Sequence, residues 1–506
     1  MSAAPDQTLL PLPRLAREMG LREATALNMI DMIGVGPFIT IPLIIQAMHG
    51  PQAMLGWIAG ALLAMCDGLV WAELGASMPQ AGGSYEYLKQ SYGAKKLGRM
   101  MSFLFVWQLL FSAPLSIASG CVGLSRYAVY VWPGLGHILV DHTFLVALPG
   151  MAFLGAFEFR LLISNATFVA MATALLALFL LYRRISVVGK IARYLSAGVI
   201  GAMLLVIVAG LAHFRFSRAF SFPAHAFDGL NNGHHLFGFL TGLGAAMLVA
   251  TYDYWGYYNV CFLGAEVRQP ERNIPRAIIY SVLIVAALYI VMNVSILGVV
   301  PWQELDQAAA SETRFYIASI VLHRTFGHWV ATFGTFLIMW TAFASVFSLM
   351  LGYSRVPYAA AMDGNYFRSY SKLHSKHQFP HISLLTLGCV ATVFCLFRLA
   401  DLIAALVVIR IMVQFLMQIL GLLLLRARRP DAPRPFRMYF YPVPALLAMA
   451  GFLYILLMRP GFMKEIRYAL VIIVVGLLIY LARSWRNKEW PFPSQNANQT
   501  VRATVQ

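Results

Sequence analysis

Three aspartates lie within long apolar segments of this 506-residue chain, namely Asp31, Asp67 and Asp253. A carboxylate at the centre of a membrane-spanning helix costs at least about 2.5 to 3.5 kcal/mol, so such a residue usually marks a substrate or proton pathway. A carboxylate among aromatic rings can also bind an amine or a guanidinium, because ion pairing adds to cation–π contact. We therefore predict that Asp31, Asp67 and Asp253 are candidates for proton coupling, and that Asp31 and Asp253 also contact a substrate.

The first apolar segment, residues 24–48, is interrupted by Ile33-Gly34-Val35-Gly36-Pro37, about one turn after Asp31. Backbone N–H and C=O groups inside a bilayer must be satisfied within the protein, so irregular backbone at that depth survives only where it lines a cavity. The break therefore predicts a binding cavity. The candidate substrate-binding residues of this first break are Asp31, Ile33, Gly34, Val35 and Gly36.

A second interruption, at residues 251–259, places a polar and aromatic stretch inside another apolar segment. Two interrupted helices at corresponding positions in the two halves of a chain point to a transporter built from inverted repeats, with its site where the repeats meet. We therefore expect the two breaks to face each other. The candidate substrate-binding residues of the second break are Tyr252, Asp253, Tyr254, Trp255, Gly256 and Tyr257.

The composition indicates a protein with many membrane spans. The chain is 60% hydrophobic and 12% charged, with a mean hydropathy of +0.70, whereas about 25% of the residues of a soluble domain are charged. About 20 apolar residues cross a bilayer. We predict twelve spans, at residues 24–48, 52–78, 98–130, 161–182, 190–213, 236–264, 276–300, 328–354, 381–398, 400–425, 439–458 and 466–483. They form a single transmembrane domain at 23–484, between tails at 1–22 and 485–506.

The positions of the basic residues predict the orientation. The net charge of +17 would suggest nucleic-acid binding in a soluble protein, but here most Lys and Arg residues fall in the loops after even-numbered spans and in the two tails. Cytoplasmic loops are rich in Lys and Arg. We therefore predict a cell-membrane protein with cytoplasmic termini and no nucleic-acid partner. The apolar residues 143–157 are predicted to be a re-entrant or interfacial loop, with an additional span as the alternative.

Three stretches resemble the amino acid–polyamine–organocation permease superfamily. They are residues 33–38, residues 72–85 (AELGASMPQAGGSY) and residues 264–277 (GAEVRQPERNIPRA). The resemblance implies the LeuT-like fold, an all-α membrane protein of twelve transmembrane helices with a five-plus-five inverted repeat. Repeat 1 would occupy about residues 24–213 and repeat 2 about residues 236–426, with helices 1 and 6 broken. Two extra C-terminal helices would follow at about residues 439–483.

The same resemblance implies roles for both breaks. In the family, N–H groups freed at the first break, here residues 34–36, hold the substrate carboxylate at the positive end of a half-helix dipole. Carbonyl groups freed at the second break, here residues 252–254, hold the substrate ammonium, and Trp255 or Tyr257 would form an aromatic lid. The Gly82-Gly83 loop and residues 266–276 would belong to the cytoplasmic gate.

The chain departs from the family pattern in its fifth span. Sodium-independent members are expected to carry a lysine there in place of a sodium ion, and this chain has Val199. Because no fixed cation replaces sodium at that position, we predict proton coupling through Asp31, Asp67 or Asp253. Ser345 and Ser348 are a possible sodium site, although hydroxyls that bond across membrane helices are common.

The sequence thus predicts a secondary-active permease for amino acids, with a preference for cationic ones. One alternative is a polyamine transporter of the same fold, because residues 66–74 and 182–189 resemble the polyamine-uptake branch. Another is an amino acid sensor that binds without translocation. The sequence has no HExxH, GxSxG or Walker motif, so we expect no enzyme, cofactor or metal. The expected partners are a small-molecule substrate and the lipid bilayer, and the oligomeric state stays open.

Overall fold

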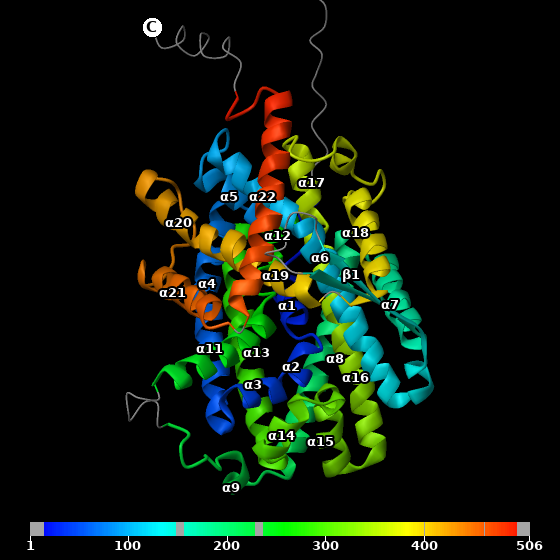
Figure 1. Ribbon diagram of the computed structural model, residues 1–506. Coiled ribbons are helices and arrows are strands. Elements are labelled where there is room, and N and C mark those ends of the chain that lie inside the picture. Colours follow the sequence, from blue (N-terminus) through cyan, green and yellow to red (C-terminus); the bar gives the residue numbers. More distant parts are fainter. Residues whose placement is uncertain (1–14, 148–155, 228–235, 399, 460, 493–506) are drawn as a thin grey trace, which may run out of the picture.

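A computed structural model describes residues 15–147, 156–227, 236–398, 400–459 and 461–492. Within these residues the chain forms one bundle of long helices, and the end of α22 lies beside α5 and α17, at the top of Figure 1. Residues 1–14 of the predicted N-terminal tail and residues 493–506 of the predicted C-terminal tail lie outside the described residues.

The first half of the bundle follows the predicted order of segments. Its helices are α1 (Leu21–Met32), α2 (Gly36–Ile39), α3 (Ile41–Met48), α4 (Met54–Ser77), α5 (Ser84–Ser91), α6 (Leu97–Val131), α7 (Asn165–Leu181), α8 (Ile185–Ala212) and α9 (Phe216–Ala219). Short helices stand at the ends of the bundle: α5 on one side, and α9 on the other (Figure 1).

The second half is also helical. Its helices are α11 (Leu236–Tyr254), α12 (Asn259–Phe262), α13 (Pro270–Val299), α14 (Trp302–Ala309), α15 (Ile317–Phe326), α16 (His328–Tyr353), α17 (Arg355–Met362), α18 (His381–Phe394), α19 (Ala400–Ile409), α20 (Met417–Arg428), α21 (Val443–Leu457) and α22 (Phe462–Arg486). A π-helical stretch, Arg410–Leu416, joins α19 to α20. Local signals explain helix starts such as that of α13, where Pro270 occupies the first turn, in which its missing N–H is not needed.

Each of the twelve predicted segments contains a helix, and many of these helices suit a bilayer. By length and apolar composition, seven described helical stretches could cross a membrane, or eight if the bent pair Leu21–Ile39 and Ile41–Met48 counts as one span. The helices α7, α18 and α21 are apolar but shorter. These helices support a multi-pass membrane protein, and the number twelve and the inverted repeat stay predictions.

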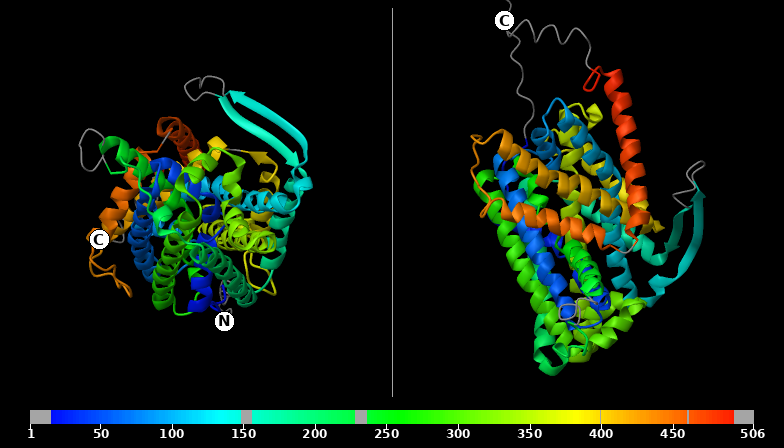
Figure 2. Two further views of the ribbon diagram at one scale, coloured as in Figure 1. Left: turned by 90° about the horizontal axis from the view of Figure 1, so that it is seen from below. Right: turned by 60° about the vertical axis from the view of Figure 1, so that its left-hand side comes forward.

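The predicted loop at residues 143–157 is a β-hairpin in its described part, which corrects the all-α expectation. Strand β1 (Ile138–Ala147) pairs antiparallel with β2 (Ala156–Ser164), and the short β3 (Phe397–Arg398) pairs with β2. The hairpin stands out from the helical bundle (Figure 2). The alternative of an additional helical span is therefore wrong. The apolar run is too short to span as a helix, and its β-branched and aromatic residues favour a strand.

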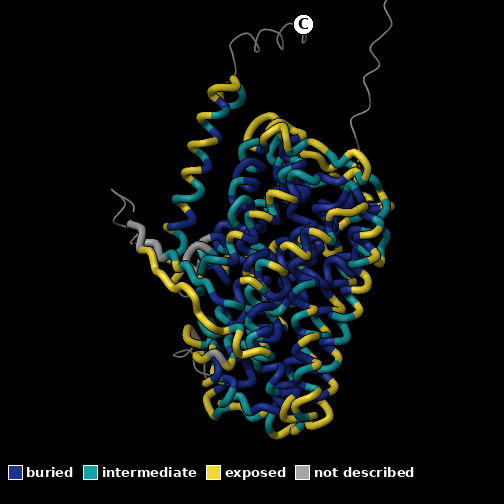
Figure 3. The backbone as a smooth tube through the Cα atoms, turned by 90° about the vertical axis from the view of Figure 1, so that its right-hand side faces the viewer, coloured by how far each residue is buried: buried dark blue, intermediate teal, exposed yellow. Residues whose placement is uncertain are grey.

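The core places α1 at the centre of the bundle. This helix packs against α8, α13 and α16, and α4 packs along α11 and α13. Buried residues fill the interior of the bundle (Figure 3). The last helix, α22, lies at the periphery. Only 22% of its most apolar 18-residue stretch is buried, whereas 72% of the corresponding stretch within Leu406–Arg428 is buried. The segment around residue 410 is thus an interior element, whereas α22 offers a surface to lipid.

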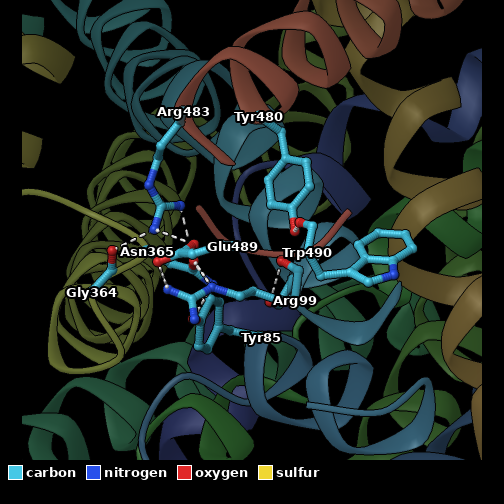
Figure 4. A network of polar contacts seen from close by, with 9 residues as sticks. Tyr85, Arg99, Gly364, Asn365, Tyr480, Arg483, Glu489 and Trp490 are labelled. Carbon is cyan, nitrogen blue, oxygen red and sulfur yellow. Dashed lines mark hydrogen bonds and ion pairs between the residues drawn. The ribbon is translucent and has the colours of Figure 1, made fainter. Parts of the chain in front are cut away.

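A polar network fixes the end of α22 to the loop after α17 (Figure 4). Asn365 Oδ1 accepts hydrogen bonds from Arg99 Nε at 3.0 Å and from Arg483 Nη1 at 2.9 Å. Glu489 pairs with Arg99 at 2.9 Å and with Arg483 at 3.5 Å. Asn365 Nδ2 also donates to the Tyr85 hydroxyl at 2.8 Å. The network therefore connects α5, α6, α17 and α22 at one end of the bundle.

Lys89 on α5 extends the contacts at this end. Its ammonium lies 2.5 Å from Glu86 and 2.6 Å from Asp363. Burial alone would lower the pKa of Lys89, but the hydrogen bonds that its ammonium donates to Asp363 and Glu86 outweigh that effect and raise the pKa above its ordinary value. The ion pair therefore persists through the neutral pH range.

Candidate functional site

The first predicted break exists, and a bend follows it. Helix α1 ends at Met32, residues 33–35 are not helical, and α2 begins at Gly36. A second interruption at Thr40 separates α2 from α3, and the axis of Ile41–Met48 is inclined by 60° to that of Leu21–Ile39. Pro37 and Pro42 stand in the first turns of α2 and α3, where a missing N–H breaks no helical hydrogen bond.

The second predicted break contacts the first directly. Helix α11 ends at Tyr254, and Gly256 follows with a φ of +129°. A methyl group on Gly256 would lie 2.8 Å from the backbone N of Met32 and 2.9 Å from the carbonyl carbon of Asp31. Only glycine suits that position, since it needs both a positive φ and a close backbone approach. The two breaks therefore face each other, as the sequence predicted.

A tyrosine from α13 ties the two breaks together. The Tyr289 hydroxyl donates to the carbonyl oxygen of Met32 at 2.8 Å and also lies 3.2 Å from that of Asp253. Breaking a helix leaves carbonyl groups without helical partners, and the single hydroxyl proton of Tyr289 lies within reach of one such group from each break. This contact fixes the distance between the two interrupted segments.

A cavity of about 190 Å³ lies between the breaks. One water molecule takes up about 30 Å³ in the liquid, so the cavity has room for a small organic molecule. Eight of the eleven predicted substrate-binding residues line it: Asp31, Gly34, Val35, Gly36, Tyr252, Asp253, Trp255 and Gly256. The sequence did not predict the other lining residues, Met32, Ile39, Thr40, Ser116, Ser119, Gly120, Tyr258, Ala342, Leu349, Tyr353 and Arg410; Ser345, predicted only as a sodium ligand, also lines it.

Asp253 lies against the start of α2. A methyl group on Gly36 would lie 2.2 Å from Asp253 Oδ1, and the Thr40 hydroxyl donates to Asp253 Oδ2 at 2.5 Å. Asp31 lines the same cavity and is buried, and its Oδ1 has no hydrogen-bond partner among the described residues. Two carboxylates therefore face one cavity, and only Asp253 has a side-chain partner that fixes it.

Arg410, a buried arginine that sequence reasoning missed, faces these carboxylates. It begins the π-helical stretch between α19 and α20, and such stretches are frequent at functional sites. Its guanidinium lies 5.6 Å from the Trp255 ring centre and 5.7 Å from that of Tyr353, within cation–π range. The signal was available, because an arginine inside an apolar span marks a pathway by the same argument that identified the aspartates.

Three predicted site residues do not line the cavity. Ile33 and Tyr254 are fully buried, and Tyr254 packs edge-on against Trp57, 5.8 Å between ring centres. Tyr257 donates its hydroxyl to Asp67 Oδ2 at 2.6 Å. The expectation that Tyr257 forms a lid over the cavity is therefore wrong in this structure, because its side chain points behind the break.

Asp67 is a buried connection between α4 and the second break. Its Oδ2 accepts hydrogen bonds from the Tyr257 hydroxyl and, at 2.9 Å, from the indole N–H of Trp71. It does not line the cavity. Its Oδ1 has no hydrogen-bond partner among the described residues. Because both donors come from residues that pack behind the second break, the contacts favour a structural role for Asp67 over direct contact with a substrate.

Hydroxyls of α16 pair with carbonyl groups of α1 in a regular series. Ser348 donates to Leu27 at 2.9 Å and Ser345 to Asp31 at 3.3 Å, while the Thr341 hydroxyl lies 3.3 Å from the Gly34 carbonyl and 2.7 Å from that of Ile338 in its own helix. A methyl group on Gly34 would lie 3.0 Å from the Ser345 hydroxyl, so Gly34 permits this close packing. The two serines therefore join helices, and their role as sodium ligands stays a prediction.

The backbone groups at the breaks are only partly free. Gly34 N–H donates to the Met32 carbonyl at 3.0 Å, whereas the N–H groups of Val35 and Gly36 have no acceptor among the described residues. In the second break the Tyr252 carbonyl already accepts from Trp255 N–H at 3.2 Å. Of the three N–H groups that the resemblance assigned to a substrate carboxylate, two remain available, and one of them belongs to Gly36, which lies against Asp253.

The residues assigned to a gate pack together at the α17 end of the bundle. Gly82 and Gly83 have φ values of +99° and +50°, and methyl groups there would lie 2.6 Å from Ala359 and from Phe262. Glu266 forms a doubly hydrogen-bonded ion pair with Arg355, at 2.9 and 3.0 Å, and both side chains are buried. Glu73 is likewise buried, paired with Arg426 and Arg434.

The sequence is similar to transporters over nearly its whole length. A family model described as amino acid permease matches residues 19–481. The branched-chain amino acid permease BcaP of Bacillus subtilis is 28% identical over 479 residues, which is 94% of each chain. The serine/threonine exchanger SteT of the same organism is 25% identical, covering 87% of this chain and 91% of SteT. The cationic amino acid transporter 4 of Mus musculus is 25% identical, covering 77% of this chain and 57% of that transporter.

Proposed function

The chain belongs to the amino acid permease family, and from this premise we propose that it moves amino acids, preferentially cationic ones, by secondary-active alternating access. The observation that supports this most is the shared cavity of the two breaks, where Gly256 touches the backbone of Asp31 and Met32. A site made from two interrupted helices opens to either side when one group of helices tilts against the other. Residues 23–484 would form the moving domain, with cytoplasmic tails at both ends.

The charges in the cavity support a cationic substrate. Asp31 and Asp253 contribute two negative charges when ionised, and Arg410 contributes one positive charge. The sum is minus one, and an amino acid with a basic side chain has a net charge of plus one. Electrostatic complementarity of this kind favours specificity. The names of the relatives include neutral and cationic amino acids, so the preference is argued from the cavity.

The same charges argue against the polyamine alternative. A polyamine has several positive charges and no carboxylate, so one of its amines would approach the buried guanidinium of Arg410 without compensation. Like charges in a low-dielectric site repel strongly. A free amino acid avoids this repulsion because its carboxylate separates the two cations.

Proton coupling is the second part of the proposal. Asp31 and Asp253 both face the cavity, so protonation of either would change the charge that the substrate meets. Asp67 would take part only through Tyr257, since it lies behind the second break. Coupling to sodium at Ser345 and Ser348 is the competing mechanism, because their hydroxyls lie beside the carbonyl groups of Asp31 and Leu27.

Uptake into proteoliposomes tests this proposal. We expect uptake of labelled L-arginine or L-lysine to increase with an inward proton gradient. We also expect that Asp253→Asn removes this dependence of uptake on the gradient. Asp306→Asn is the matched control, because Asp306 is part of α14 and pairs with the exposed His49. Uptake that ignores the proton gradient and is stimulated by sodium would contradict proton coupling. Counterflow of labelled substrate distinguishes a carrier from a sensor, which would bind without exchange.

A further inference from the structure

Arg410 is a buried cation that shares its cavity with Asp31 and Asp253 but forms an ion pair with neither carboxylate. Its side chain is 94% buried, since only 6% remains exposed, and it lines the cavity. Among the described residues it forms no ion pair, and the hydrogen bond that it donates to the Ser112 hydroxyl is long, at 3.4 Å. A buried guanidinium without a carboxylate is unfavourable. It is therefore a group that gains from an anion brought in by a ligand.

The usual position for a substrate anion is already occupied by a carboxylate of this chain. Asp253 Oδ1 lies so close to Gly36 that an added methyl group would be 2.2 Å away, and Thr40 fixes its other oxygen at 2.5 Å. Of the two free N–H groups, that of Gly36 belongs to the residue against which this carboxylate lies, and that of Val35 precedes it in the chain. A second carboxylate at that place would meet like-charge repulsion.

The rings around Arg410 restrain its orientation. The ring centres of Trp255 and Tyr353 lie 5.6 and 5.7 Å from the guanidinium, so both rings contact it within cation–π range, and both line the cavity. Ser116, Ser119 and Tyr252 also line both this cavity and the small adjoining one that Arg410 borders. A planar guanidinium fixed in this way presents two parallel N–H groups, the geometry that binds a carboxylate.

We propose that Arg410 binds the α-carboxylate of the transported amino acid, while Asp253 and Asp31 receive its amino groups. This inference rests on the proposed function and changes the position expected for the carboxylate, from the first break to the π-helical stretch after α19. The substrate lies across the cavity between these two elements. Arg410 is therefore the residue that distinguishes an amino acid from the amine that has the same side chain but no carboxylate.

The test compares each amino acid with the amine that lacks its carboxylate. Thermal stabilisation of the purified full-length protein is measured with L-arginine and agmatine, L-lysine and cadaverine, and L-leucine and isoamylamine. Selective ligands stabilise the folded state by mass action. The wild type is expected to bind the amino acid of a pair at least tenfold more tightly than the amine. Arg410→Gln is expected to reduce this ratio of the two affinities at least tenfold.

Two further variants keep the inference falsifiable. Arg410→Lys retains the charge, so it is expected to fold and to keep part of the preference for the carboxylate. Arg324→Gln is the control, because Arg324 pairs with Glu304 on the exposed side of α15, and the ratio should not change. If Asp31→Asn combined with Arg410→Gln restores the ratio, Arg410 acts only as a counterion of Asp31 and the inference is wrong.

The outcomes separate this inference from the proposed function. If only L-leucine among the amino acids stabilises the wild type, the cationic preference fails, and the pair of L-leucine and isoamylamine still tests Arg410. If Arg410→Gln weakens the binding of an amino acid and of its amine by the same factor, or changes neither affinity, Arg410 does not bind the carboxylate. If agmatine or cadaverine binds the wild type as tightly as the amino acid, the inference fails as well.

Discussion

Adding one methyl group at Gly36 gives a sharp test of the contact between the two breaks. The methyl group of Gly36→Ala would lie 2.2 Å from Asp253 Oδ1, which is 0.8 Å less than the 3.0 Å that real Cβ contacts keep. The Asp253 carboxylate must therefore move, and it then loses the 2.5 Å hydrogen bond from Thr40 or enters the cavity. In both cases the place of the substrate amine changes.

The size of the effect follows from that hydrogen bond. A hydrogen bond to a charged group contributes about 1.5 to 3 kcal/mol, and about 1.4 kcal/mol corresponds to a factor of ten. We therefore expect Gly36→Ala to weaken substrate affinity by about 10- to 100-fold, measured by thermal stabilisation and by the KM of uptake. Gly201→Ala on α8 is the control, because a methyl group there meets nothing within 4 Å, and affinity should stay unchanged.

A double-mutant cycle shows whether the proposed cause is the real one. Thr40→Val removes the same hydrogen bond but leaves Gly36 unchanged. If both changes act through the Asp253–Thr40 contact, their combined effect is smaller than the sum of the single effects. Strict additivity, or a Gly36→Ala variant with the affinity of the wild type, would refute the reasoning.

Three other predictions concern the contacts around the site. Glu266→Gln breaks a buried ion pair, so it should lower the free energy of unfolding by about 3 to 5 kcal/mol. Glu304→Gln breaks an exposed pair and should lower it by at most about 1 kcal/mol. Equal losses of stability in thermal unfolding would contradict the burial of Glu266. Tyr257→Phe removes a donor to Asp67 and should cost about 1 to 3 kcal/mol of stability without changing substrate affinity; a specific loss of affinity would mean that Tyr257 is a lid. Ser348→Ala should cost about 0.6 to 1.7 kcal/mol, independent of sodium; a sodium-dependent loss of stabilisation would support the sodium site.

The breaks were predictable because the constraint that reveals them is local. A glycine-rich or polar stretch inside a spanning segment has few explanations in lipid, so residues 33–36 and 252–257 could be identified from sequence. Which side chains in a break point to the cavity was not predictable, because irregular backbone has no period that assigns a face. Trp255 lines the cavity, whereas Tyr257 turns to Asp67.

Other differences have separate causes. Arg410 was not predicted because it is far from both breaks along the chain, so the sequence does not reveal that it lines the same cavity. The pairing of residues 138–147 with residues 156–164 was missed because a short apolar run does not distinguish a strand from part of a helix. The close approach of Asp253 to Gly36 depends on how α11 packs beside α3 and α4, which a single sequence does not specify.

A structure of the protein with its tightest-binding amino acid, obtained by electron cryo-microscopy, tests the central claim most directly. The account predicts ligand density in the cavity between the two breaks, with the amino groups at Asp253 and Asp31 and the carboxylate at Arg410. Density outside this cavity would contradict the claim that the breaks form the binding site. A carboxylate bound at residues 34–36, with Arg410 untouched, would contradict the role of Arg410 alone.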